Sequence, residues 1–202
     1  MMLIEETVVP AAALPVAEFR DHMRLGTGFA DLGAEDAALE AYLRAAMAAI
    51  EGRTAKVLLA RDYLLTLEAW RGEAQPLPVA PVSAVSLIRV RDQAGVAAVV
   101  SPARYRLVRD LGRPRITAVG MLPGIPTGGV VEIAFTAGFG PAWSDLPADL
   151  AQAVFLLAAQ YYELRHEGAR GGDAMPFGVM ALIERWRTVR VLGGRPSAGG
   201  LV

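Results

Sequence analysis

Residues 146–165 carry an apolar pattern that fits a helix buried on more than one side. Pro147 suits a first helical turn, and Asp145 and Asp149 place negative charge near the positive end of the helix dipole. Two apolar rows follow at helical spacing: Leu150, Val154, Leu157, Tyr161 and Leu164 in one, and Ala151, Phe155, Ala158 and Tyr162 in the other. A surface helix of a monomer usually carries one apolar stripe. We therefore expect one row to face the core and the other a second body, such as a neighbouring subunit; the pattern leaves open which row does which.

The composition limits the classes of protein to which the chain can belong. It has 202 residues, 53% of them hydrophobic, a net charge of −1 and no cysteine. These values argue against extensive disorder and against nonspecific coating of nucleic acid, and they exclude disulfides, thiolate catalysis and cysteine-ligated zinc. No apolar run reaches the roughly 18 residues of a membrane helix, and the N-terminus lacks the pattern of a signal peptide. We expect a soluble, intracellular protein that makes no membrane contact.

Helical periodicity predicts three further helices. A short helix follows Pro15 and ends at the glycines of residues 26–28. A second begins near Glu35 and Asp36 and ends at or near Gly52. A last amphipathic helix runs from about Phe177 to Trp186. The apolar face of the second helix comprises Leu39, Leu43, Ala46, Met47 and Ile50.

Between the second helix and the 146–165 helix, the hydrophobic period changes to the alternation of strands. A proline-rich link at 76–81 follows the first strand, and residues 92–95 have the composition of a hairpin turn. The predicted strands cover residues 63–68, 85–90, 96–100, 105–108, 115–119 and 130–137.

This order of elements predicts an α+β fold, in which a small antiparallel β-sheet is inserted between the second and third of about four helices. We expect a mobile or loosely docked N-terminal arm at 1–14. Residues 15–60 and 142–192 form the helical body, and residues 61–141 form the inserted β-region. The Gly- and Ser-rich residues 193–202 form a flexible C-terminal tail.

Motifs that would carry chemistry are missing from the sequence. His22 and His166 lie on different predicted helices and do not form a metal-spaced pair. The glycines at 26–28 and at 138–140 lack the lysine and the context of a phosphate-binding loop. The carboxylates are scattered, which leaves open only an unrecognised hydrolase. We therefore expect no catalytic residues, no metal, no cofactor and no enzymatic activity.

Arginines cluster near the C-terminus, where Trp186 lies among them. One interpretation is a solvated helix face with cations near its end. The other is a contact surface for an acidic partner protein or for passing DNA, in which Trp186 anchors an interface rather than the core. The arginines concerned are Arg165, Arg170, Arg185, Arg187, Arg190 and Arg195.

Four segments together resemble the head–tail connector (adaptor) proteins of long-tailed bacteriophages and of the related gene transfer agents. Each segment alone consists of common residues, and the resemblance depends on their order and spacing over residues 15–192. The segments are residues 36–46 leading to 50–54, the proline-flanked 77–85, 134–140 followed by Leu146-Pro147, and 160–165 followed by 176–179 and Leu182.

The resemblance implies a structural protein of the virion neck, assembled in the bacterial cytoplasm. Such proteins form a ring, commonly of twelve subunits, beneath the portal protein. The ring extends the DNA channel without sequence-specific binding and docks the stopper or another neck or tail protein. The family's portal-engaging C-terminal segment corresponds here to Trp186, Arg187, Arg190, Val191, Leu192, Leu201 and Val202. The neighbouring subunit is expected to contact Val154, Phe155, Leu157, Tyr161 and Tyr162.

Other interpretations of the sequence remain open. Within the same machinery, the chain could be a stopper or a tail-completion protein, which its position in purified particles would reveal. An unrecognised hydrolase would show turnover abolished by one Asp or Glu substitution. A DNA-binding module would show strong, salt-sensitive affinity for duplex DNA.

Overall fold

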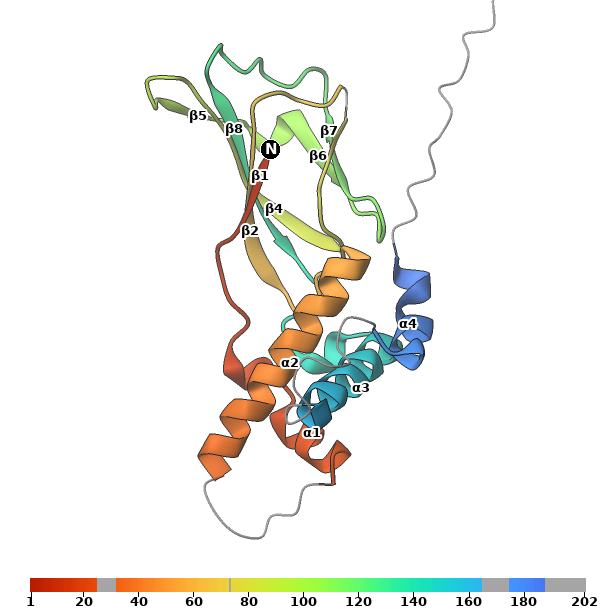
Figure 1. The fold of residues 1–202 in the computed structure, drawn as a ribbon. Coiled ribbons are helices and arrows are strands. Elements are labelled where there is room, and N and C mark those ends of the chain that lie inside the picture. The colour runs from red at the N-terminus through yellow and green to blue at the C-terminus, as the bar shows by residue number, and fades with distance from the viewer. Residues whose placement is uncertain (25–31, 73, 165–174, 188–202) are drawn as a thin grey trace, which may run out of the picture.

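The computed structural model describes residues 1–24, 32–72, 74–164 and 175–187. Helices gather at one end of the molecule and strands at the other (Figure 1). In the described part of the chain, seven strands lie between the second and third helices and one precedes the first helix, so the predicted α+β fold is confirmed. Within the described residues, the helices are α1 (Val16–His22), α2 (Leu32–Thr54), α3 (Ala148–Leu164) and α4 (Phe177–Ile183).

The strands form two antiparallel sheets rather than the single sheet predicted. One has the order β1-β2-β8-β4-β5 and the other the order β3-β7-β6. Strand β3 (Ala74–Pro76) extends into the start of the proline-rich link, and its edge position tolerates Pro76, which has no N–H to donate. The remaining strands are β1 (Met2–Glu5), β2 (Arg61–Leu67), β4 (Val82–Arg91), β5 (Ala97–Val99), β6 (Tyr105–Val108), β7 (Arg115–Ala118) and β8 (Val130–Ala137).

The two sheets share one apolar core. In β2, Tyr63, Leu65 and Leu67 are buried and alternate with half-buried residues, as the period of a strand requires. Their partners on β8 are buried in the same way, and Ile116 on β7 joins them from the second sheet. The predicted hairpin turn closes between β4 and β5, where the Asp92 N–H donates to the Val96 carbonyl at 3.0 Å.

The N-terminal segment is not the loosely docked arm that was predicted. Strand β1 pairs with β2 from Met2 opposite Thr66 to Glu5 opposite Tyr63. Beyond it, Val9 and Leu14 are buried in the helical core. The composition of residues 1–14 does not reveal this, because β1 obtains its hydrogen bonds from the edge of β2 rather than from local structure.

Helix α2 continues through Gly52 and ends two residues later. The Thr54 hydroxyl donates to the Ile50 carbonyl at 2.8 Å. Ala55 then takes a left-handed conformation, with φ of 55°. The chain therefore leaves the helix at Ala55, because continuing an α-helix requires a negative φ.

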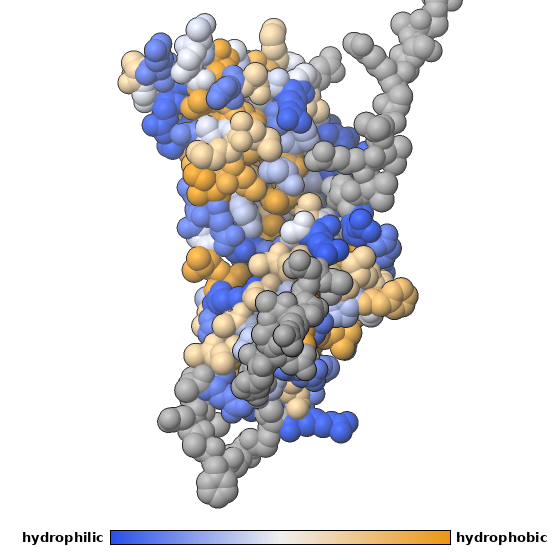
Figure 2. Space-filling model, viewed as in Figure 1, coloured by the Kyte–Doolittle hydropathy of each residue, from blue (hydrophilic) through white to orange (hydrophobic). Residues whose placement is uncertain are grey.

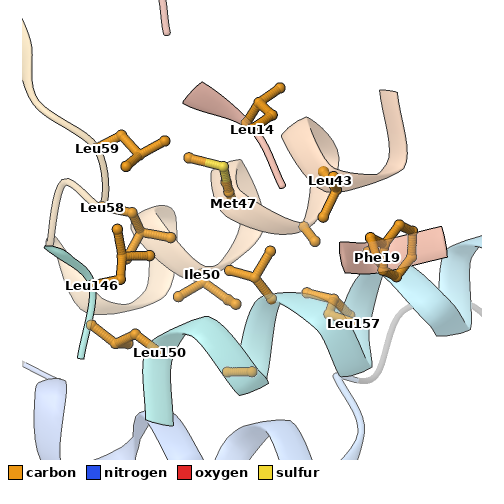
Figure 3. Close-up of a cluster of buried hydrophobic side chains, with 14 of the residues drawn as sticks. Leu14, Phe19, Leu43, Met47, Ile50, Leu58, Leu59, Leu146, Leu150 and Leu157 are labelled. Atoms are coloured by element: carbon orange, nitrogen blue, oxygen red, sulfur yellow. The ribbon is translucent and has the colours of Figure 1, made fainter. Parts of the chain in front are cut away.

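Helix α3 packs its first apolar row into the core of the helical body (Figure 3). Leu150 and Val154 are fully buried and Leu157 is 2% exposed. They contact a cluster that includes Leu43, Met47, Ile50, Leu58, Leu59 and Leu146. The row through Leu157 therefore faces the core of its own subunit from Leu150 to Leu157, whereas Tyr161 and Leu164 at its end are half-buried. Val154 and Leu157 have no surface left for a neighbour, which removes them from the predicted subunit interface.

The helical body and the β-region are joined where residues 58–60 lie beside residues 138–140. The Ala60 N–H donates to the Gly140 carbonyl at 2.8 Å, and the Phe139 N–H donates to the Leu58 carbonyl at 3.1 Å. Gly138 has φ of 135°, and a Cβ atom there would lie 2.5 Å from the Ala60 backbone. The glycines of this segment thus allow close packing of two backbones.

A half-buried ionic cluster crosses the same junction. Arg61 on β2 donates to Glu51 on α2 at 2.5 Å and to Glu5 on β1 at 2.9 Å. The Leu58 N–H also donates to the Glu51 carboxylate, at 2.8 Å. Burial raises the pKa of the Glu51 carboxyl above its ordinary value, and the charge and hydrogen bond of Arg61 oppose that rise. The cluster therefore ties three elements together at a site that water reaches poorly.

We predict that Gly138→Ala lowers the free energy of unfolding by about 2–4 kcal/mol, because it adds backbone strain and a steric overlap with Ala60. The matched control is Gly52→Ala on the exposed side of α2, where an added Cβ has nothing within 4 Å. This control should raise stability by about 0.5–1 kcal/mol. Urea unfolding followed by circular dichroism measures both. Equal stability of the two variants would contradict the close approach at Gly138.

Removal of Arg61 tests the ionic cluster. Arg61→Ala should lower the free energy of unfolding by about 3–5 kcal/mol, because it leaves the Glu51 carboxyl buried without its partner. Arg44→Ala removes a half-buried partner of Glu40 four residues away on α2 and should cost less than about 0.5 kcal/mol. Thermal unfolding of the two variants at neutral pH compares them, and similar losses would show that the cluster contributes little.

Candidate interaction surfaces

The second apolar row of α3 forms an aromatic side on the helical body. Phe155 stacks on Trp143 with 5.4 Å between ring centroids and also contacts Phe19 at 5.6 Å and His22 at 5.4 Å. Tyr162 meets Tyr42 edge-on at 5.9 Å. Because Phe19 is fully buried whereas His22 is exposed, this group of rings runs from the core to the surface.

Three of the five predicted subunit-interface residues therefore remain at the surface. Phe155, Tyr161 and Tyr162 are each half-buried in the single subunit. Each packs against the helical core and keeps part of its surface exposed. We name Phe155, Tyr161 and Tyr162 the aromatic side of α3.

Trp186, which was predicted to contact the portal, belongs to the subunit's own core instead. Its indole N–H donates to the Asp149 carboxylate at 2.7 Å, and its ring meets Phe139 edge-on at 5.4 Å. The Arg185 guanidinium lies 4.7 Å from the ring centroid and also bonds to Asp149, at 2.7 Å. The Trp186 side chain has its partners within the fold, so it does not project as an interface anchor.

The rest of the predicted portal-contact set falls into two groups. Arg187 is exposed and pairs with Glu184 at 3.0 Å. The other five predicted portal contacts lie outside the described residues: Arg190, Val191, Leu192, Leu201 and Val202. His166, Arg165, Arg170 and Arg195 lie outside the described residues as well.

Phe177 is an exposed apolar residue that the sequence reasoning did not assign to a surface. It begins α4 directly after Pro176, and its side chain is 88% exposed. The helical period contains the signal, since Val179 and Ile183 are one turn apart and both buried, and Phe177 falls on the opposite side. A large apolar side chain held this far out on an ordered helix is available for another body.

The outer face of the five-stranded sheet is partly apolar. Met2 and Ile4 on β1 and Val99 on β5 are exposed, and Leu64 and Leu87 between them are half-buried. Figure 2 shows hydrophobic residues gathered over the strands on this side of the β-region. On the same face, Glu132 bonds to both Arg89 and Arg91. Burial acts to raise the pKa of the Glu132 carboxyl, but hydrogen bonds from these two arginines hold that pKa below its ordinary value.

The described residues offer no assembled site for metal chemistry. Among them, no group of three or more His, Asp or Glu side chains is placed to hold a metal ion. A membrane-spanning helix, long and apolar enough to cross a bilayer, is also not found in the part of the chain that the structure describes.

Three solved structures resemble this chain over nearly its whole length. They are the neck of an empty GTA particle computed with C6 symmetry (73% identity, TM-score 0.87), the virion of a native gene transfer agent (GTA) particle (72%, 0.84) and the neck of a native GTA particle computed with C12 symmetry (66%, 0.83). Each similarity covers 97% of this chain and 100% of the other. No family model and no curated protein matches the chain.

The contrast between Trp186 and Phe177 can be measured directly. Trp186→Ala should lower the free energy of unfolding by about 3–5 kcal/mol, because it empties a packed site and leaves Asp149 without its indole donor. Phe177→Ala should change it by less than about 0.5 kcal/mol, since it alters only the surface. Chemical denaturation of both variants checks the assignment. Equal losses would mean that one of the two residues has been placed wrongly.

Proposed function

The chain belongs to the family of gene transfer agent neck proteins, and on that basis we propose that it is the head–tail connector (adaptor) of such a particle. As a neck component it is a structural part of the virion. In the adaptor role, it forms a ring beneath the portal protein, extends the channel through which DNA passes, and docks the next neck or tail protein. The single observation that carries this proposal is the 66–73% identity to neck and virion chains over their full length.

A ring of copies is supported by the C6 and C12 symmetry of the similar neck structures. In a ring, one surface of each subunit meets a different surface of the next, so a subunit needs two interface patches. We propose the aromatic side of α3 as one patch and exposed Phe177 on α4 as part of the other. Aromatic side chains are enriched at the centres of such interfaces.

Docking to the portal is proposed for the C-terminal end of the chain, beginning at Arg187 and including Arg190, Val191, Leu192, Leu201 and Val202. Trp186 directly precedes this segment in the sequence, and its contacts with Asp149 and Phe139 hold Trp186 in the helical body. The apolar residues among these positions can bury surface on a partner.

Assembly with the portal protein of the same particle tests the proposal. Size-exclusion chromatography with light scattering should show the full chain moving into a multi-subunit complex when portal is added. Phe177→Ser should keep the fold and reduce this complex at least tenfold, because it removes an apolar anchor from the interface. A matched control is Val8→Ser, which removes a similarly exposed apolar side chain (78%, against 88% for Phe177) outside the two patches.

Two results would contradict the proposal. A chain that stays monomeric in the presence of portal is not the adaptor. Equal loss of assembly in the Phe177 and Val8 variants would show that general surface apolarity, rather than the α4 patch, drives association.

Truncation after Leu192 should leave thermal stability unchanged and weaken portal docking. Unchanged docking would show that residues 193–202 do not contact the portal.

A further inference from the structure

The β6–β7 hairpin carries a concentration of positive charge. Residues 101–120 contain five arginines and a single acidic residue, Asp110, which gives this segment a net charge of +4 in a chain whose total is −1. All five arginines are exposed: Arg104, Arg106, Arg109, Arg113 and Arg115.

The strand register directs two of these arginines away from the core. Arg106 pairs opposite Thr117, and Arg115 pairs opposite Val108. The intervening residues Leu107 and Ile116 pack into the core shared by the two sheets. Because successive side chains of a strand point to opposite faces, Arg106 and Arg115 lie on the outer face of the three-stranded sheet.

The ends of the hairpin hold further arginines beside this face. Arg104 donates to the Met121 carbonyl at 2.7 Å, which fixes it next to the start of β6. In the turn, the Asp110 carboxylate accepts from the N–H groups of Gly112 and Arg113 at 2.8 and 2.7 Å. These hydrogen bonds lower the pKa of Asp110 below its ordinary value. The one acidic side chain of the segment is thus used to order the turn.

Four of the five arginines have no ion-pair partner in the part of the chain that the structure describes. They are Arg104, Arg106, Arg109 and Arg115. On the five-stranded sheet the situation is the opposite, because Arg89 and Arg91 both bond to Glu132. The unpaired guanidinium groups therefore mark the β6–β7 face as a surface for an anionic partner.

The chemistry of the face favours a polyanion over a protein. A protein interface centres on apolar or aromatic anchors that lose their contact with water. On this face, the neighbours of Arg106 and Arg115 are Thr117 and the half-buried Val108. The exposed apolar side chains nearby lie off the face, with Leu111 in the turn and Val119 beyond the end of β7. Arginine guanidinium groups match phosphate oxygens in geometry as well as in charge.

We propose that the outer face of the β6–β7 hairpin binds the phosphate backbone of duplex DNA in the neck without reading base sequence. The choice of DNA as the polyanion rests on the proposed neck function. In a ring, the face recurs once in every subunit, so weak contacts from each copy add along the DNA. A weak contact in a single subunit agrees with the near-neutral charge of the whole chain and still allows DNA to move.

The test is the salt dependence of binding to a fluorescent duplex of mixed sequence, measured by anisotropy with the full chain. Contact of four arginines with phosphates gives a slope of log K against log salt of about −3.6. Affinity should then fall about 100-fold between 50 and 200 mM salt. The double variant Arg106→Gln/Arg115→Gln should reduce the magnitude of that slope by about 2. A second duplex of unrelated sequence should bind with the same affinity.

The matched control is Arg44→Gln/Arg185→Gln, which removes the same charge from two arginines of the helical body that are paired with Glu40 and Asp149. Its slope should equal that of the unmodified chain. Equal slopes for all three proteins would overturn the inference, as would equal reductions in both double variants. If the Arg106/Arg115 double variant lost binding to the portal or to another neck protein but kept its DNA binding, the inference would be overturned in favour of a protein interface.

Ring formation on the portal separates this inference from the proposed function. The Arg106/Arg115 double variant should still assemble on the portal as the unmodified chain does. A chain that assembles on the portal but shows no salt-dependent DNA binding contradicts only the DNA-binding face. A chain that binds DNA through this face but never assembles on the portal contradicts the adaptor function.

Discussion

The arrangement of the two halves of the molecule depends on the junction at Arg61. This arginine bonds to Glu51 at the end of α2 and to Glu5 on β1, so it connects the helical body with two strands of the five-stranded sheet. Beside it, Gly138 allows the return segment from β8 to approach the backbone of Ala60. Because charge and close packing act at one place, the β-region is held in a defined position on the helices. That position determines where each exposed surface faces.

Surfaces of three chemical kinds result from this arrangement. The helical body presents aromatic and apolar side chains, with Phe155 and the tyrosines on α3 and Phe177 on α4. The five-stranded sheet presents apolar residues around the neutralised group of Glu132. The three-stranded sheet presents arginines without ion-pair partners among the described residues. The proposed contacts with copies of the chain, with other neck proteins and with DNA need surfaces that differ in this way.

Sequence periodicity predicted the elements whose signal is local, such as α3 and strand β8. It could not predict β1, because Met2–Glu5 becomes a strand only through pairing with β2. It could not assign Trp186, since the deciding partner, Asp149, lies 37 residues earlier in the chain. The arginine face was hidden because the total charge is near zero, and only the register of β6 and β7 brings Arg106 and Arg115 to one side. Which apolar row of α3 faces the core likewise depended on the position of α2.

We propose above that this chain assembles as a ring on the portal. Electron microscopy of the purified chain mixed with the portal protein of its particle tests it most directly. We expect ring-shaped particles in which a layer of this chain sits on one end of the portal around an open channel, with a rotational symmetry like that of the similar neck structures. Portal particles that carry no added layer, at concentrations where the chain is folded and in excess, would contradict it.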